Sequence, residues 1–212
     1  MISFLWDNDV LFKITDLNLW TELESILTID KSNHFYLNTC IHVARKKAFP
    51  SDQTKVVKLE SILKKMSIVK AAKNIELLSL LSDQVGIDAG EALLYTKLYD
   101  IDPSFLYTGD KRSLLALQAL SDKKIDLTFL NHRVILWEYI LELIIQRLSI
   151  ESIQEKFSNQ TWTDNAFKVI FSKHNLTNKE SLLESIQSYI REAETKYGRF
   201  LVSKAQILGL QS

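Results

Sequence analysis

Three aspartates that lie far apart in the chain occupy positions where functional sites are found in open α/β sheets. Asp7, Asp88 and Asp110 each come at or just after the end of a short apolar run. The carboxyl ends of parallel strands meet in one crevice, so we expect these side chains to converge. Converging carboxylates repel one another, and such a cluster persists at neutral pH mainly when a cation lies among them. The pattern therefore predicts a Mg²⁺ or Mn²⁺ site, and a hard divalent ion suits hydrolysis of a phosphodiester bond.

Two further acids stand close in sequence to these aspartates. Asp9 follows Asp7 by two residues, and Glu91 follows Asp88 by three, a spacing that puts both carboxylates on one face of a helix. The predicted metal ligands are Asp7, Asp9, Asp88 and Asp110, and the predicted catalytic residues are Asp7, Asp88, Glu91 and Asp110. A structural alternative stays open, because D-x-x-E also forms a capping box and Asp110 could be an N-cap.

Polar side chains next to Asp110 could act on the substrate. Thr108 could orient a water on the metal, and the cations of Lys111 and Arg112 could hold a phosphate. The alternative is that both cations are ordinary exposed charges on a helix.

A basic segment earlier in the chain could form a wall of a phosphate-binding groove. Between residues 45 and 73, nine basic residues oppose two acidic ones, a net charge of plus seven, and we predict that Lys46 and Lys47 bind substrate. The same charges could instead be the solvated faces of two helices. The whole chain has a net charge of zero, so it has no overall attraction to nucleic acid or to anionic membranes.

The composition is that of an ordinary globular protein. The 212 residues are 46% hydrophobic and 25% charged, enough for one domain with an extension or for two small domains. Cys40 is the only cysteine, which fits a reducing cytoplasm. The first apolar run stops at Asp7, unlike a signal peptide, and charges interrupt the apolar segment 134–150. We predict a cytoplasmic protein that does not enter the membrane.

Short apolar runs alternate with helical patterns over the first 149 residues. Strands are predicted at 2–6, 35–37, 67–69, 105–108 and 133–137. Helices are predicted at 17–27, 38–47, 52–65, 75–81, 89–99, 113–120 and 138–148. This alternation predicts an α/β domain, 1–149, with a mostly parallel sheet covered by helices on both faces. Residues 150–212 show only helical patterns (153–157, 166–171 and 179–208) and are expected to pack on that domain or to support a homodimer.

Three segments resemble motifs of PIN domains. F-L-W-D-N-D-V-L-F (4–12) is similar to the opening D-T-N-V-L of that family, and G-I-D-A-G-E-A-L-L (86–94) to the helix with its third acid. L-Y-T-G-D-K-R-S-L (106–114) is similar to the T-x-D-K strand end, the most specific of the three. Their order and spacing agree as well, and the resemblance covers roughly residues 1–140.

The resemblance implies a PIN-like parallel sheet and an acidic pocket that binds Mg²⁺ or Mn²⁺. It also implies a metal-dependent endoribonuclease, in many bacterial cases the toxin of a toxin–antitoxin pair or a defence effector. RNA and an antitoxin or other protein are then the expected partners. In this comparison Asp7 is the first acid, Asp88 the third and Asp110 the fourth. Asp9 stands where the family usually has asparagine, and Glu91 would be an auxiliary acid.

One departure from the family leaves other functions open. The second acid of PIN domains lies on the helix after the second strand, but residues 31–51 contain no Asp or Glu. Asn38 or His42 could substitute, or Glu91 could fill the gap; otherwise the domain would be a degenerate module that binds RNA or protein. A haloacid dehalogenase-type phosphatase is a third alternative, because D-N-D at 7–9 resembles its D-x-D motif, although Leu114 stands where a later acid is needed.

Overall fold

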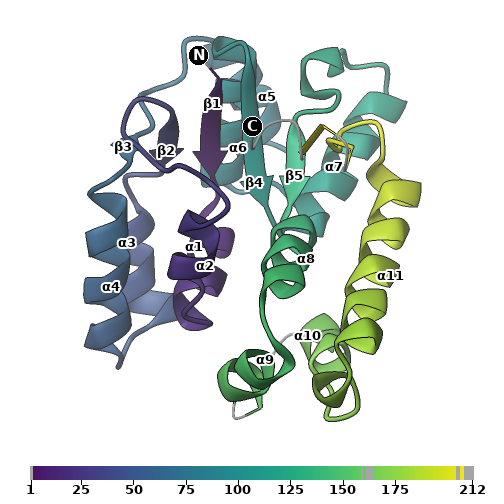
Figure 1. Cartoon of the computed structure of the whole chain (residues 1–212). Coiled ribbons are helices and arrows are strands. Elements are labelled where there is room, and N and C mark those ends of the chain that lie inside the picture. The colour runs from purple at the N-terminus through teal and green to yellow at the C-terminus, as the bar shows by residue number, and fades with distance from the viewer. Residues whose placement is uncertain (1, 159, 161–164, 204–205, 208–212) are drawn as a thin grey trace.

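The computed structural model describes residues 2–158, 160, 165–203 and 206–207. Its centre is a five-stranded sheet in the order β3-β2-β1-β4-β5, and every strand pairing is parallel (Figure 1). The strands are β1 (Ser3–Trp6), β2 (His34–Tyr36), β3 (Ser67–Ile68), β4 (Ser104–Thr108) and β5 (Val134–Leu136). The predicted α/β class with a parallel sheet is therefore confirmed.

The three strands β1, β4 and β5 are short apolar runs because helices cover both of their faces. All four residues of β1 are buried, and so are all three residues of β5. Leu5, in the middle of β1, pairs with Phe35 of β2 on one side and with Leu106 of β4 on the other. Parallel strands buried on both faces read as continuous hydrophobic runs, which is the pattern that predicted them.

The helices of the α/β part form two groups. They are α1 (Asn8–Asp16), α2 (Trp20–Glu24), α3 (Cys40–Val43), the π-helix η1 (Ala44–Ala48), α4 (Gln53–Leu63), α5 (Ile75–Ser82), α6 (Ala89–Asp100), α7 (Lys111–Asp122), the short η2 (Thr128–Leu130) and α8 (Trp137–Arg147). The helices α1 to α4 connect β1, β2 and β3 in one direction across the sheet, and α5 to α7 connect β3, β4 and β5 in the other. Right-handed crossovers then place the two groups on opposite faces. The contacts agree, since α1 packs on α4 and α5 packs on α6 (Figure 1).

The first helix differs from the sequence-based prediction. The sequence predicted a helix at 17–27, whereas the structure has α1 at Asn8–Asp16 and the shorter α2 at Trp20–Glu24. Asn18 adopts a φ of 55°, in the left-handed region, and this conformation separates the two helices. In the D-N-D motif at 7–9, Asp7 is therefore the N-cap of α1 and Asp9 lies in the first turn of that helix.

The C-terminal segment is helical as predicted and packs on the α/β part. It contains α9 (Ile150–Phe157), α10 (Asn165–Ile170), η3 (Asn175–Thr177) and α11 (Lys179–Tyr197). The helix α11 lies against α8 and α7 (Figure 1). The chain then returns to the sheet, where the backbone N–H of Val202 donates to the carbonyl of Val134 at 2.9 Å and covers the outer edge of β5. The domain boundary at 149/150 stays a prediction.

The predicted helix at 179–208 is too long. Helix α11 ends at Tyr197. The backbone N–H of Phe200 then donates to the carbonyl of Tyr197, and that of Leu201 to the carbonyl of the C-cap Gly198. Residues 204, 205 and 208 of that prediction lie outside the described residues.

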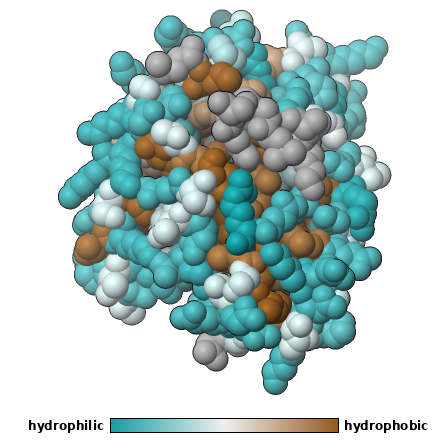
Figure 2. Space-filling model, viewed as in Figure 1, coloured by the Kyte–Doolittle hydropathy of each residue, from teal (hydrophilic) through white to brown (hydrophobic). Residues whose placement is uncertain are grey.

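In the part of the chain that is described, no helix is both long and apolar enough to cross a membrane. Hydrophilic side chains cover most of the face in Figure 2, with hydrophobic ones visible between them.

Ile186 tests how much the C-terminal helix contributes to the fold. Its side chain is fully buried in the middle of α11. We expect Ile186→Ala to lower the free energy of unfolding by about 2–5 kcal/mol, the usual cost of removing a buried aliphatic side chain. Urea denaturation measures this loss, and Ser188→Ala on the exposed side of α11 is the control, expected to stay within about 0.5 kcal/mol. A loss below about 1 kcal/mol for Ile186→Ala would contradict the packing of α11 on the α/β part.

Candidate metal centre

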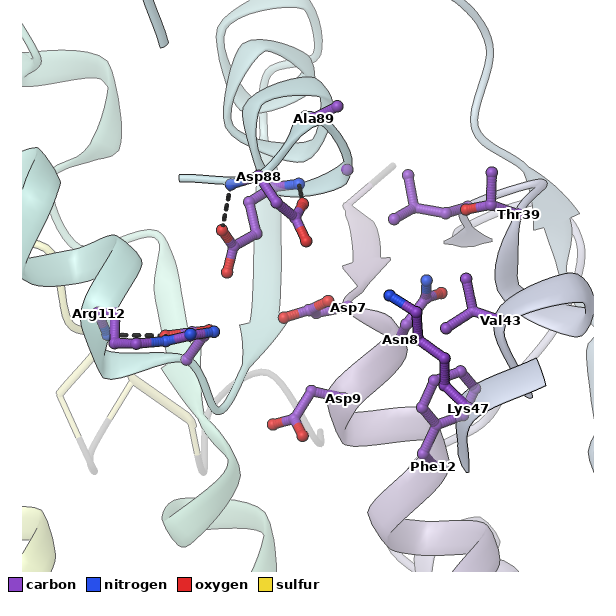
Figure 3. A pocket seen from close by; sticks show the side chains of 14 residues that line it. Asp7, Asn8, Asp9, Phe12, Thr39, Val43, Lys47, Asp88, Ala89 and Arg112 are labelled. Atoms are coloured by element: carbon purple, nitrogen blue, oxygen red, sulfur yellow. Dashed lines mark hydrogen bonds and ion pairs between the residues drawn. The ribbon is translucent and has the colours of Figure 1, made fainter. Parts of the chain in front are cut away.

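A cavity of about 620 Å³ lies where β1 and β4 end, and the predicted acids all line it. Its acidic lining residues are Asp7, Asp9, Asp88, Glu91 and Asp110. Figure 3 shows Asp7 between Asp88 and Asp9, with Arg112 on one side of the cavity and Thr39, Val43 and Lys47 on the other. Segments up to 103 residues apart in sequence thus contribute carboxylates to one space. Asp7 and Asp110 follow strands β1 and β4, as predicted. The apolar run 85–87 is not a strand, since Val85 is 98% exposed, and Asp88 reaches the cavity as the N-cap of α6.

Asp7 is one of two buried acids in the cavity, together with Glu91. It follows β1 directly, its backbone N–H donates to the carbonyl of Tyr107 at 3.0 Å, and only 7% of its surface is exposed. The hydroxyl of Thr108 donates to Oδ2 of Asp7 at 2.9 Å. Burial, followed by the charges of Asp9 and Asp88, raises the pKa of Asp7 to about 7, although the Thr108 hydrogen bond lowers it. In the free protein this carboxyl group is therefore only partly ionised at neutral pH.

Asp88 and Glu91 form the capping box that the sequence allowed, and both also line the cavity. The backbone N–H of Glu91 donates to Oδ1 of Asp88 at 2.8 Å, and the backbone N–H of Asp88 donates to Oε2 of Glu91 at 2.7 Å. Burial is the largest cause that raises the pKa of Glu91 to about 8. The Asp88 backbone bond opposes this shift, and the charges of Asp110, Asp7 and Asp88 add to it. The same two side chains therefore cap α6 and contribute carboxylates to the cavity.

Two substitutions separate the roles of Glu91. Gln keeps an oxygen that can accept the backbone N–H of Asp88, so we expect Glu91→Gln to retain stability. Glu91→Ala removes the cap and is expected to cost about 1 kcal/mol, measurable by urea denaturation. Both variants remove the carboxylate and should weaken Mn²⁺ binding alike in a calorimetric titration. If only the alanine variant binds Mn²⁺ less tightly, then Glu91 supports Mn²⁺ binding by capping α6 and not by its negative charge.

Asp110 is the N-cap of α7 and is held by a neighbouring cation. Its Oδ1 accepts the backbone N–H of Arg112 at 2.7 Å and of Ser113 at 3.4 Å. The guanidinium of Arg112 lies 2.5 Å from Oδ2 through Nη2 and 3.2 Å from both oxygens through Nε. Burial raises the pKa of Asp110, but the hydrogen bonds and charge of Arg112 outweigh it, so the net pKa is below its usual value. Thr108 links this end to Asp7, since its hydroxyl accepts the backbone N–H of Asp110 at 3.2 Å.

Asp9 lies in the first turn of α1 and pairs with Lys13, whose Nζ is 2.6 Å from Oδ2. Gly109 makes this arrangement possible. A Cβ atom at that position would lie 2.5 Å from Oδ2 of Asp9 and 2.7 Å from Nζ of Lys13, so a larger residue would displace the pair. Asn8 and Phe12, four residues apart on α1, also line the cavity. Sequence reasoning missed both because it did not predict α1.

The wall formed by α3 and η1 carries no carboxylate. Thr39, Val43 and Lys47 line the cavity from this side, at a spacing of four residues that places them on one helical face. Asn38 and His42, the proposed substitutes for the missing second acid, are exposed and do not line the cavity. These two alternatives are therefore not placed at the cavity, because the helical face that carries Thr39 and Lys47 turns both residues away from it. Glu91, the other alternative, does line the cavity.

The predicted substrate-binding residues divide between the cavity and its surroundings. Lys47 and Arg112 line it, whereas Lys46 is exposed outside it. Lys111 is held elsewhere, with Nζ 2.9 Å from Oε1 of Glu138 and 5.3 Å from the centre of the Tyr189 ring. Thr108 is buried and positions the acids instead of facing the cavity.

The basic segment 45–73 is partly neutralised within the fold. Arg45 pairs with Glu60 at 2.5 Å, Lys55 pairs with Asp16 at 2.7 Å, and Lys65 pairs with Glu24. Among the cavity-lining residues described, Lys47 is the one that this segment contributes. The alternative of solvated helix faces fits most of these charges better than a continuous phosphate-binding wall.

The chemistry of the cavity fits a hard cation. Five carboxylates line it against two cationic side chains, Lys47 and Arg112. Within the described ranges, no three Asp, Glu, His or Cys side chains already form a ligand group for one ion. Most of the acids are instead bonded inside the protein: Asp110 to Arg112, Asp9 to Lys13, and Asp88 and Glu91 to each other's backbone. A divalent ion would neutralise the surplus of negative charge and would favour the ionised form of Asp7, which lowers its raised pKa.

Comparison with known proteins adds no assignment to this geometry. No protein-family model matches the chain, and no curated protein or solved structure is significantly similar to it. The resemblance of three segments to PIN domains therefore stays a prediction that rests on those segments.

Proposed function

We propose that the protein is a Mg²⁺- or Mn²⁺-dependent endoribonuclease that hydrolyses phosphodiester bonds of RNA. The observation that carries this proposal is the convergence of acids from three separate parts of the chain in one open cavity at the carboxyl ends of β1 and β4. The order of the strands supports it, because sites in open parallel sheets lie at this edge.

The side chains of the cavity have separate tasks in this proposal. Asp7, Asp88 and Asp110 hold the divalent ion, and the Thr108 hydroxyl fixes the orientation of the Asp7 carboxylate. A bound divalent ion supplies an activated water and neutralises the charge that develops on the phosphate. Glu91 uses Oε2 for the cap, which leaves Oε1 to hold or accept a proton near neutral pH.

The choice of RNA and the cellular setting rest on the resemblance to PIN domains. We infer a cytoplasmic enzyme of the toxin–antitoxin or defence type, regulated by an antitoxin or another protein partner, with a homodimer through the C-terminal helices as a further expectation. The cationic side chains Lys47 and Arg112 are the residues placed to bind phosphate at the cavity.

One observation favours a second candidate, a non-catalytic module that binds RNA or protein. The wall where PIN domains carry their second acid presents Thr39, Val43 and Lys47 instead of a carboxylate. A cation in that position weakens the attraction for a metal ion and strengthens the attraction for a phosphate chain.

A cleavage assay separates the two candidates. Purified protein is incubated with total RNA in Mn²⁺, in EDTA, and in EDTA followed by excess Mn²⁺; Asp88→Asn protein purified in the same way controls for contaminating nucleases. Asn is as good an N-cap as Asp, so this control keeps its fold. The proposal predicts cleavage that EDTA abolishes and Mn²⁺ restores. Retention of RNA without cleavage in every condition would support the binding module, and equal cleavage by the control would contradict the assigned site.

A further inference from the structure

Arg112 has an unusual position among the cations of the protein. Its side chain is 85% exposed, yet its guanidinium is directed back onto Asp110, whose side chain is only 16% exposed. It lines the main cavity (Figure 3). It also lines an adjoining cavity of about 190 Å³, which Asp88 and Glu91 line as well. The guanidinium therefore lies at the junction of two spaces that are both lined by carboxylates.

The Arg112–Asp110 pair is easily separated. The two residues are two positions apart, so the pair closes no long loop and holds no distant elements together. Solvent screens the exposed guanidinium, which limits what this ion pair contributes to stability. The backbone bonds from Arg112 and Ser113 to Oδ1 keep Asp110 at the N-cap when the guanidinium leaves. Lys111, next to it in sequence, is fixed by Glu138 and the Tyr189 ring, and so differs from Arg112 in this respect.

We propose that Arg112 is an exchangeable counter-ion that couples occupation of the cavity by a cation to binding of a phosphate. This inference rests on the proposed function and deepens it. In the free protein the guanidinium neutralises Asp110. When a divalent ion takes that carboxylate, the guanidinium is released at the cavity mouth, where it binds a phosphate of the RNA strand next to the one that is cleaved. Arg suits this exchange, because its planar donors match carboxylate and phosphate equally well.

The exchange predicts opposite effects of one substitution on two ligands. Arg112→Ala removes a competitor for Asp110, so Mn²⁺ should bind about 2- to 5-fold more tightly in a calorimetric titration, the range that the strength of an exposed ion pair allows. The same variant loses a phosphate contact. Its dissociation constant for a fluorescein-labelled single-stranded RNA, measured by anisotropy in millimolar Ca²⁺, should rise about 5-fold. A residue with a merely structural role would not move the two affinities in opposite directions.

Lys123→Ala is the matched control, since it removes one exposed positive charge at the other end of α7, away from the cavity. It should change neither affinity. If Arg112→Ala binds Mn²⁺ as wild type does or less tightly, or binds RNA as wild type does, the exchange is overturned while the nuclease proposal stands. If the wild-type protein takes up no Mn²⁺, the proposed metal centre itself fails, and the exchange fails with it.

Discussion

Asp110→Asn is expected to reduce RNA cleavage at least about 100-fold without unfolding the protein. Loss of residues that only support a metal ligand already costs roughly 10- to 100-fold, and Asp110 is a proposed ligand. The fold should survive because Asn can accept the backbone N–H groups of Arg112 and Ser113 as Asp110 does. Initial rates on a fixed RNA substrate in saturating Mn²⁺ measure the loss, and circular dichroism checks the fold.

A matched Asp→Asn substitution controls for this experiment. Asp126 also accepts bonds from a neighbouring backbone N–H and hydroxyl, both from Thr128, but it is exposed and does not line the cavity. Asp126→Asn should cleave RNA at the wild-type rate. Retained cleavage by Asp110→Asn would remove this residue from the metal centre and with it the assignment of the β4 end as part of the site.

Asp7→Asn is expected to abolish Mn²⁺ binding and at the same time to stabilise the metal-free protein at pH 8. The Asp7 carboxyl is buried with a pKa of about 7, so its ionised form destabilises the fold. Removing that charge should raise the free energy of unfolding by about 2–4 kcal/mol at pH 8. A gain in stability together with a loss of binding is characteristic of a residue retained for function.

The pH dependence of this effect has a definite sign. The pKa of Asp7 is higher in the folded than in the unfolded protein, so the folded state binds more protons between about pH 4 and pH 7. The stability of the metal-free wild type therefore decreases as pH rises through this interval and then levels off. Glu91, with a pKa of about 8, extends the decrease to higher pH. Urea denaturation in EDTA at pH 5 and pH 8 should show a much larger difference between Asp7→Asn and wild type at pH 8 than at pH 5.

Added Mn²⁺ should reverse the order of the two proteins, because the ion stabilises only the protein that retains the carboxylate. Equal stabilities of Asp7→Asn and wild type at pH 8 in EDTA would show that Asp7 is compensated inside the protein and has no need of a cation.

The parts of the fold that the sequence predicted are those whose signals are local. Strand β1 and helices α6 and α7 follow from apolar runs and from Asp88 and Asp110 as caps, all readable within a few residues. The convergence of Asp7 and Asp110 followed from the rule that parallel strands end at one edge. Asp88 reaches the cavity from the start of α6 instead, because the apolar run 85–87 forms no strand. Helix α1 was missed because it begins directly after Asp7 without a loop and without a side-chain cap bond.

Assignments that depended on distant partners were less accurate. Lys111 and Arg112 are neighbouring cations, and the sequence does not distinguish their roles. The tertiary contacts of Lys111 with Glu138 and Tyr189 do. The four-residue spacing of Thr39, Val43 and Lys47 places them on one helical face, but none of them carries the carboxylate that the resemblance to PIN domains leads one to expect there. The end of α11 depended on the return of the chain to β5, which no local pattern encodes.

A calorimetric titration with Mn²⁺ at pH 7, in two buffers of different ionisation enthalpy, tests the metal centre most directly. At this pH Asp7 of the free protein is partly protonated and Glu91 mostly protonated, since their pKa values are raised to about 7 and 8. Binding of a divalent ion requires ionised carboxylates, so the account predicts Mn²⁺ uptake coupled to proton release, and loss of both in Asp7→Asn. No uptake at millimolar Mn²⁺, or uptake with no proton released, would contradict it.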